Sequence, residues 1–385
     1  MKHLLIRDFG PIKEALLDLG QVNVITGLQS SGKSCVLKTA CYCSWVEKRL
    51  QMTQQINGFG KDSAFIDMMV EYYHLDGYVR DTTYIEYETT GVKFWYEHAN
   101  RKFNMKWNSA HWNFRRPKVS YIPADRNLVA AIPAWSGVSI DRNMLEFMSD
   151  WDNARKRIKR EENFLNLGLS YEYDKSVGSD SVILQNGKPM DLKSSSSGIQ
   201  SLLPMYVHLD YLSHGQYAEN QSSLNFEEKE ERSKLRSTIY KKLCQKKQDG
   251  ELVVFVNIDG YDYGFTEIKH AKRFKKIYEH YTVVDHSEIF LEEPEDNLFP
   301  PTQCQLVNWL LENIGHHNDM LFIATHSPYV LSQLVKVGPS DIKVFFTHEI
   351  ESVEREFTIR CLTSEEISEM YSGGVDLFFN FEMFL

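Results

Sequence analysis

Residues 27–34 have the types and spacing of a loop that binds phosphate groups. Their sequence is Gly-Leu-Gln-Ser-Ser-Gly-Lys-Ser, in which four residues separate two glycines and the second glycine is followed by lysine and serine. In such a loop, backbone N–H groups surround phosphate oxygens, the lysine contacts the β- and γ-phosphates, and the serine hydroxyl binds Mg²⁺. The apolar residues 22–26 predict a strand before the loop, and residues 33–49 predict a helix after it, which is the context that the pattern requires. We therefore expect an ATP and Mg²⁺ site formed by Gly27, Gln29, Ser30, Ser31, Gly32, Lys33, Ser34 and Cys35.

Two adjacent carboxylates, Glu292 and Glu293, follow the apolar residues 289–291. A buried strand would hold both acids rigidly beside the phosphate loop. We expect Glu292 to bind Mg²⁺ directly or through water, together with Ser34, and Glu293 to orient and deprotonate the attacking water. The alternative is a solvated run of charge, which explains poorly why apolar residues precede the acids and a proline follows them.

A histidine, His326, ends a second apolar stretch at residues 321–324. It could sense the γ-phosphate and help to position the water. A histidine at the end of a strand is more often structural, but its position after two nucleotide motifs favours a catalytic role.

A serine-rich turn at residues 194–198 precedes an apolar helical stretch. One interpretation is a flexible linker ending in a helix N-cap. A serine hydroxyl and a glycine N–H at a helix start also form a corner that binds anions. The turn resembles the ABC signature in its shorter Ser-Ser-Gly-x-Gln form, and the four motifs follow one another in the ABC order. That resemblance adds Ser196, Ser197, Gly198 and Gln200 to the nucleotide site, as the surface that binds the γ-phosphate held by another protomer.

The motifs together resemble the prokaryotic AAA-type ATPases of the RecF, SMC and OLD class. The matching segments are residues 6–12, 27–34, 121–126, 197–198, 292–300 and 325–328. The resemblance implies an ABC-type ATPase that hydrolyses ATP in composite sites of a homodimer or higher homo-oligomer, with a D-loop after Glu293. Relatives often have a histidine where Phe299 stands here and another near Asn297, and both are absent, so no role of those histidines carries over.

The same resemblance indicates a partner. OLD-type relatives commonly carry a TOPRIM nuclease after the switch histidine, and the residues after His326 contain no such metal-binding pattern. Similar ATPases accompany a separate effector, a nuclease or a toxin, in anti-phage systems, and an effector of that kind is the partner expected here.

The expected fold class is α/β, an ABC-type P-loop ATPase head with a mostly parallel core sheet, an antiparallel β lobe and a helical signature lobe with an insertion. Residues 1–140 would form an N-terminal lobe with a β meander at 82–107. Residues 141–250 would form the signature lobe, with a helix at 142–165 and an inserted charged arm at 215–248. Residues 251–385 would form a C-terminal lobe that returns to the core and ends in an apolar tail.

Composition restricts the remaining choices. A hydrophobic content of 42% without a run long enough to span a bilayer favours a cytoplasmic protein without a membrane contact, and the six cysteines have no metal or disulfide spacing. With a net charge of −10, DNA contact would need local basic patches, at residues 155–160, 241–247 and 272–276. The alternative function is thus a RecF-like DNA clamp. A transporter motor is disfavoured by the short signature, and binding without turnover by the two glutamates.

Overall fold

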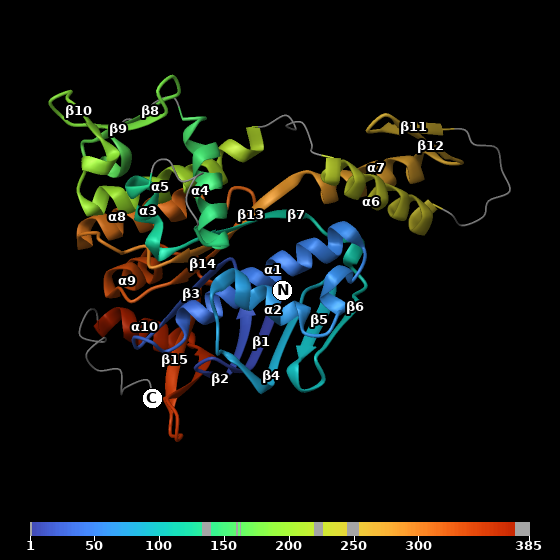
Figure 1. Cartoon of the computed structure of the whole chain (residues 1–385), viewed down its shortest axis with the longest axis horizontal. Helices are drawn as coiled ribbons and strands as arrows, with labels where there is room; N and C mark the ends of the chain where they lie inside the picture. Colours follow the sequence, from blue (N-terminus) through green and yellow to red (C-terminus); the bar gives the residue numbers. More distant parts are fainter. Residues whose placement is uncertain are drawn as a thin grey trace.

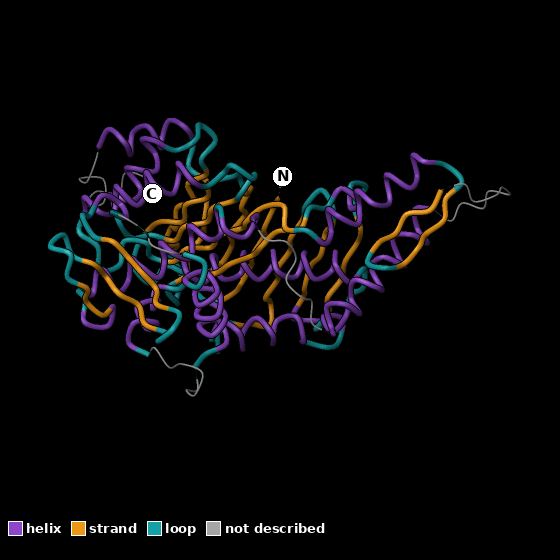
Figure 2. The backbone as a smooth tube through the Cα atoms, turned by 90° about the horizontal axis from the view of Figure 1, so that it is seen from above, coloured by secondary structure: helices purple, strands orange, loops and turns teal. Residues whose placement is uncertain are grey.

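The computed structural model describes residues 2–132, 140–158, 161, 163–218, 226–244 and 254–373. Figures 1 and 2 show two views of the chain at right angles. Three sequence features lie outside the described residues: the apolar tail at 375–385, Lys159 with Arg160, and Lys246 with Lys247.

A large sheet runs through the middle of the molecule. Among the described residues it has 11 strands in the order β6-β5-β4-β1-β2-β16-β15-β3-β14-β13-β7. Its parallel half consists of β15 (Lys343–Ile350), β3 (Val22–Gly27), β14 (Met320–Ala324), β13 (Val284–Glu292) and β7 (Arg116–Ile122). This arrangement places the ends of β3, β14 and β13, which carry the expected motifs, next to one another.

The other half of the sheet is antiparallel. It contains β1 (Lys2–Phe9), β2 (Ile12–Leu19), β4 (Val79–Glu88), β5 (Val92–Glu97) and β6 (Lys102–Trp107), and β16 (Glu356–Cys361) connects it to β15. The predicted meander is confirmed, since β4, β5 and β6 pair antiparallel in sequence order. We expected it as a lobe set against the core sheet, whereas hydrogen bonding makes it a continuation of that sheet.

Helices cover both faces of the parallel half. On β13, Ile289 and Leu291 belong to one core with residues of α5 (Ser197–Ser213), α8 (Pro300–Asn313) and α9 (Pro328–Val337). Phe290, between them, packs into the opposite core with α1 (Lys33–Thr53) and α2 (Ala64–Tyr73). Successive side chains of a strand point to opposite faces, which is why a continuous apolar strand serves both cores. The α/β fold class with a parallel core sheet and an antiparallel lobe is confirmed.

The elements of the expected signature lobe pack on the α5 face. It contains α3 (Leu128–Ala131), α4 (Arg142–Arg155), α5, and a small antiparallel sheet of β8 (Ser170–Asp174), β9 (Ser179–Ile183) and β10 (Pro189–Asp191). A helix was predicted over 142–165, but α4 ends at Arg155, and the described residues between 156 and 165 do not continue it. Asn163, Leu165 and Asn166 have positive φ values, a conformation that ends a right-handed helix.

An arm projects from the opposite end of the molecule (Figures 1 and 2). It consists of α6 (Phe226–Cys244), α7 (Ile268–Thr282) and a hairpin of β11 (Val254–Ile258) and β12 (Tyr261–Phe265). The buried apolar side chains of these elements share a core with Met52 at the end of α1. The strand that we expected to return to the core sheet near residue 251 is β11, and it pairs with β12 instead. Helix α10 (Ser364–Gly373) ends the described chain. None of the described helices is long and apolar enough to cross a membrane.

Candidate functional site

The loop after β3 has a backbone conformation that requires glycine at two positions. Gly27 has a φ of 141° and Gly32 a φ of 88°. A Cβ on Gly27 would lie 1.9 Å from Thr347 Oγ1, and one on Gly32 would lie 2.4 Å from Ile12 Cδ1. Both positions therefore exclude a side chain, and the loop curls closely against β15 and β2 before α1 begins. The N-terminus of α1 adds a partial positive charge beside the loop.

Lys33, the first residue of α1, reaches back into this loop. Its ammonium donates hydrogen bonds to the carbonyl oxygens of Leu28 at 2.5 Å and Gly27 at 3.2 Å. Burial lowers the pKa of Lys33 to about 8, against the opposing effect of the nearby Glu293 and Glu295 carboxylates. A desolvated cation among carbonyl dipoles is stabilised by an added anion, so the charge of a phosphate fits this position.

The other expected loop residues differ in exposure. Gln29 and Ser30 are exposed, Ser31 is buried and its Oγ accepts a hydrogen bond from Thr347 at 2.7 Å, and Ser34 is half-buried. Cys35 is 4% exposed and its thiol packs in the core between α1 and the sheet. Its side chain thus faces away from the site, and only its backbone N–H remains available to a ligand.

The two carboxylates at the end of β13 have different surroundings. Glu292 is 8% exposed, and its Oε2 accepts a hydrogen bond from the Tyr121 hydroxyl at the end of β7. Glu293 has a positive φ of 42°, and its N–H bonds to the carbonyl of Ala324 at 2.9 Å. The strand therefore ends between the two acids, which separates a buried carboxylate from a half-exposed one.

His326 and Glu293 face each other across the ends of β14 and β13. Their Nε2 and Oε1 atoms are 3.4 Å apart. The hydrogen bond from His326 lowers the pKa of Glu293, and the charges of Lys33 and Arg126 act in the same direction. Glu293 is thus held as a carboxylate at neutral pH, the form that a general base needs.

Glu295 positions the segment that carries His326. Its Oε1 accepts hydrogen bonds from the Thr325 hydroxyl at 2.8 Å and from the His326 N–H at 2.6 Å. Its Oε2 is buried without a partner among the described residues, and burial raises the pKa of this carboxyl. The sequence analysis assigned Glu295 no role, although its place three residues after Glu292 was an available signal.

Arg126 is a second residue that the sequence analysis did not assign. It is fully buried, and its guanidinium donates to the carbonyl oxygens of Glu292 at 2.9 Å, Glu293 at 2.8 Å and Ser201 at 3.2 Å. One side chain thereby fixes the backbone of both acids and ties it to α5, the signature helix. Desolvation lowers the pKa of Arg126 to about 10, which still leaves it charged at neutral pH.

The signature residues stand at the exposed start of α5. Ser196 and Ser197 are exposed, whereas Gln200 turns back and donates to the carbonyls of Lys193 at 2.9 Å and Ser195 at 3.0 Å. Gly198 is packed so closely that a Cβ would lie 2.8 Å from the carbonyl oxygen of Asn297. The expected D-loop therefore touches the signature turn within one chain.

The loop 27–34 and the side chains expected to act in catalysis meet at one edge of the sheet. Because β3, β14 and β13 are adjacent and parallel, their carboxyl ends place Lys33, His326 and Glu293 together, the position where ligands bind in open α/β sheets. Within the described part of the chain, no hydrogen bond or ion pair links the signature serines to residues 27–34. The exposed serine corner is therefore directed toward solvent or toward another molecule.

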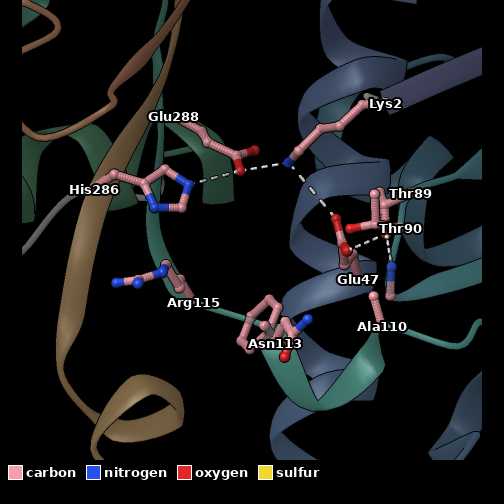
Figure 3. Close-up of a pocket in the computed structure, with 11 residues that line it drawn as sticks. Lys2, Glu47, Thr89, Thr90, Ala110, Asn113, Arg115, His286 and Glu288 are labelled. Atoms are coloured by element: carbon pink, nitrogen blue, oxygen red, sulfur yellow. Dashed lines mark hydrogen bonds and ion pairs between the residues drawn. The ribbon is translucent and has the colours of Figure 1, made fainter.

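An ion network lies behind the site and joins its two main elements (Figure 3). Lys2 on β1 bonds to Glu288 on β13 and lies 3.6 Å from Glu47 on α1. His286 approaches Glu288 from the other side, with 3.4 Å between Nε2 and Oε1. Lys2 and His286 hold the pKa of the buried Glu288 well below its usual range. The helix that begins after the loop 27–34 is thus tied to the strand that ends at Glu292 and Glu293.

The donor set fits a Mg²⁺ that arrives with a nucleotide. Among the described residues no group of three or more His, Cys, Asp or Glu side chains gathers as a closed metal site. Mg²⁺ in nucleotide enzymes is commonly held by one or two protein oxygens together with phosphates and waters. The Ser34 hydroxyl and the Glu292 carboxylate are the oxygens that this chain offers.

Comparison with known proteins gives a partial likeness. No family model matches the sequence, and no curated protein sequence matches it. Among solved structures, the SMC head domain from Thermotoga maritima aligns with a TM-score of 0.44 at 10% identity, covering 94% of this chain and 98% of that one. An SMC head bound to the C-terminal winged-helix domain of ScpA aligns with a TM-score of 0.42 at 8% identity, covering 95% and 98%. An SMC head with an extended coiled coil, bound to a ScpA domain derived from Pyrococcus furiosus, aligns with a TM-score of 0.32 at 9% identity, covering 97% and 99%. Likeness at this level carries no functional argument, which rests on the site described above.

Proposed function

We propose that this chain is a Mg²⁺-dependent ATPase of the ABC type, which binds ATP in the loop 27–34 and hydrolyses it with Glu293 as general base. The observation that carries the proposal is the position of Glu293. Its ionised carboxylate lies 3.4 Å from His326 and near Lys33, at the shared edge of β3, β14 and β13.

Each residue has a role that follows from its surroundings. The loop N–H groups and Lys33 bind phosphate oxygens, and Ser34 and Glu292 hold Mg²⁺, which when bound neutralises charge on the β- and γ-phosphates. Glu293 accepts the proton of the attacking water through Oε1 or Oε2. His326 orients the Glu293 carboxylate by hydrogen bonding, and Glu295 fixes the backbone of His326.

The signature corner supports a site shared between two protomers. Ser196, Ser197 and Gly198 start α5 and are accessible from outside, while Gln200 in this conformation serves its own turn. A second protomer facing the site would bring this corner to the γ-phosphate, where a helix N-terminus stabilises negative charge. The proposal is therefore a head-to-head homodimer, or a higher homo-oligomer built from it.

The wider role rests on the resemblance to ATPases of the RecF, SMC and OLD class. We place the protein in the cytoplasm, where ATP-driven association and release of its heads gates a separate effector, a nuclease or a toxin, in anti-phage defence. In this role, ATP hydrolysis sets how long the heads stay associated, and the effector carries out the final reaction.

Turnover measurements test the proposal directly. Purified protein with ATP and Mg²⁺ should release phosphate, whereas Lys33→Ala should lose both nucleotide binding and turnover, because no other loop side chain supplies a cation to the phosphates. Lys38→Ala, which changes a half-buried lysine about one and a half turns further along α1, is the matched control. Equal turnover by wild type and Lys33→Ala would contradict the proposal.

A second candidate, a DNA clamp, is favoured by one surface. Four exposed cations on α7, at positions 269, 272, 273 and 276, follow the i, i+3, i+4, i+7 spacing that places them on one side of the helix. Duplex DNA binding that weakens steeply with salt and is reduced by Lys272→Ala with Arg273→Ala would support it. Binding that is absent at low salt, or unchanged in this variant, would exclude α7 as a DNA surface.

A further inference from the structure

A cavity opens beside the middle of α1, away from the loop 27–34. Its volume is about 270 Å³, near the lower end of the range for small-molecule sites. It is enclosed by α1, α2, α4 and β7, and its walls are mainly aromatic and apolar; they include Tyr42, Trp45, Tyr72, Tyr73 and Tyr121. Because α1 rises about 1.5 Å per residue, Cys41 in this wall lies roughly 12 Å along the helix from Lys33. The cavity is therefore separate from the expected phosphate site.

The aromatic walls suit a flat ligand. Tyr73 contacts Tyr121 edge to face at 5.4 Å and Tyr72 at 4.7 Å, so the inner wall is a rigid group of rings. Trp45 stacks on Tyr42 at 5.7 Å and is 39% exposed, which places an indole at the mouth. Rings arranged in this way bind planar molecules by stacking, since every planar heterocycle offers a π-face.

The rim supplies polar recognition groups. Arg142 and Glu146 lie one turn apart on α4, line the cavity and are exposed. Arg142 offers donors, and Glu146, which already accepts a hydrogen bond from the Tyr72 hydroxyl, offers acceptors. A donor beside an acceptor at the edge of an aromatic slot matches the mixed hydrogen-bonding edge of a nucleobase. The volume admits a base or nucleoside more readily than a nucleoside triphosphate.

The floor of the cavity connects to the catalytic acids. Tyr121 lines the cavity with its ring, and its hydroxyl bonds to Glu292 at the end of β13. A ligand stacked against Tyr73 and Tyr121 would set the position of that hydroxyl, and so the position of the Glu292 carboxylate. Occupancy would thereby alter the metal ligand without touching the nucleotide.

We propose that this cavity is a regulatory site for a free nucleobase or its nucleoside, which acts on ATP turnover through Tyr121 and Glu292. Binding to the cavity stands by itself, whereas its effect on turnover rests on the proposed ATPase function.

The binding test uses the full chain without ATP. Adenine, guanine, cytosine, uracil and their nucleosides are titrated by calorimetry into wild type, Lys33→Ala, Trp45→Ala, Arg142→Ala and Trp107→Ala. At least one compound should bind wild type, Lys33→Ala and Trp107→Ala equally. Its affinity should fall about tenfold in Trp45→Ala, because stacking on an aromatic side chain contributes this much per base. It should also fall in Arg142→Ala, an exposed change that leaves the core intact.

Other outcomes overturn the site. The absence of binding by any of these compounds at concentrations up to about 1 mM would contradict the site. Binding that is lost in Lys33→Ala would also contradict it, because the ligand would then occupy the phosphate loop. Affinities for Trp45→Ala and Arg142→Ala that both equal the wild-type affinity would also contradict the site.

The coupling test measures phosphate release with and without the bound compound. We expect a change of at least twofold in kcat for wild type and none for Tyr121→Phe, which keeps the ring and loses the hydroxyl. A compound that binds without changing wild-type turnover would overturn the regulatory role. If wild type hydrolyses no ATP, the ATPase proposal fails, and the calorimetry still decides whether the cavity binds a base.

Discussion

The imidazole of His326 lies against the carboxylate of Glu293, with 3.4 Å between Nε2 and Oε1. This contact joins the ends of two parallel strands and lowers the pKa of Glu293. Replacing His326 by alanine should raise the pKa of Glu293 toward its ordinary value. Since the base must be ionised, the acidic limb of the kcat profile should move to higher pH, and kcat should fall by about 10²-fold. A profile of kcat against pH for both proteins measures this, and an unmoved acidic limb would show that His326 does not act on Glu293.

Arg126 should be important for both stability and turnover. Its guanidinium bonds to the backbone of Glu292 and Glu293 and to Ser201. Arg126→Met leaves buried carbonyls without donors and should lower the free energy of unfolding by about 3 kcal/mol. Arg126→Lys keeps the charge but cannot reproduce the planar set of donors, so it should recover only part of that loss. Denaturant unfolding measures both variants. Two variants within about 0.5 kcal/mol of wild type would contradict this role.

The Lys2 and Glu288 pair should behave as a buried ion pair. Lys2→Met leaves the Glu288 carboxylate buried without its main cation and should cost about 3–5 kcal/mol of stability. The double variant Lys2→Met with Glu288→Leu should recover most of it, since apolar replacement of both partners removes the uncompensated charge. Urea unfolding of the three variants measures the coupling, and a double variant as unstable as the sum of the single ones would argue against a direct pair.

The same pair predicts a pH dependence. The folded-state pKa of Glu288 is lowered, so its contribution is complete above the unfolded pKa of about 4.3 and is lost as pH falls toward the folded value. The pKa of Lys2 is raised, so its contribution is complete below its unfolded pKa of about 10.4 and is lost only as pH rises through its folded value. Wild type should thus lose more stability than the double variant between about pH 5 and pH 3. Parallel acid-induced losses would contradict the assignment.

Complementation between two inactive variants should reveal shared sites. Ser197→Arg should bind ATP in its own loop but block the site of a facing protomer, and Lys33→Ala should bind no ATP. In a mixed dimer, one site combines an intact loop with an intact signature. Phosphate release should therefore appear on mixing, up to about a quarter of the wild-type rate if mixed dimers form at random and each site acts alone. Light scattering in the presence of ATP measures whether the mixed protomers associate. Mixed samples that associate with ATP but stay inactive at all ratios would contradict sites that act independently.

The parts of the site that sequence could predict are those encoded in contiguous residues. The loop 27–34, the pair Glu292 and Glu293, and His326 each follow an apolar strand, and parallel pairing of β3, β14 and β13 brings them together. Residues 121–126 belong to a segment that carries the resemblance, but Tyr121 and Arg126 contact residues more than 160 positions away, and no local pattern reveals those contacts. Their importance appears only when the chain is folded.

In the arm, strand pairing was likewise not predicted from the local sequence. The residues of β11 are mostly apolar, like those of a core strand, and their own types do not indicate which strand they pair with. Asp259 and Gly260 form the turn to β12 with φ values of 50° and 84°. An Asp-Gly dipeptide between apolar residues is a strong hairpin signal, and it was the available indication that β11 pairs with its neighbour in sequence.

The exchange of Glu293 for glutamine tests the central claim most directly. Glutamine keeps the shape of the side chain but cannot accept a proton from water. With ATP and Mg²⁺, Glu293→Gln should bind ATP with nearly wild-type affinity, as measured by calorimetry. Its turnover should fall by 10²–10⁴-fold, the usual contribution of a general base. Turnover equal to that of wild type in a variant that binds ATP would show that this carboxylate does not activate water and would contradict the account.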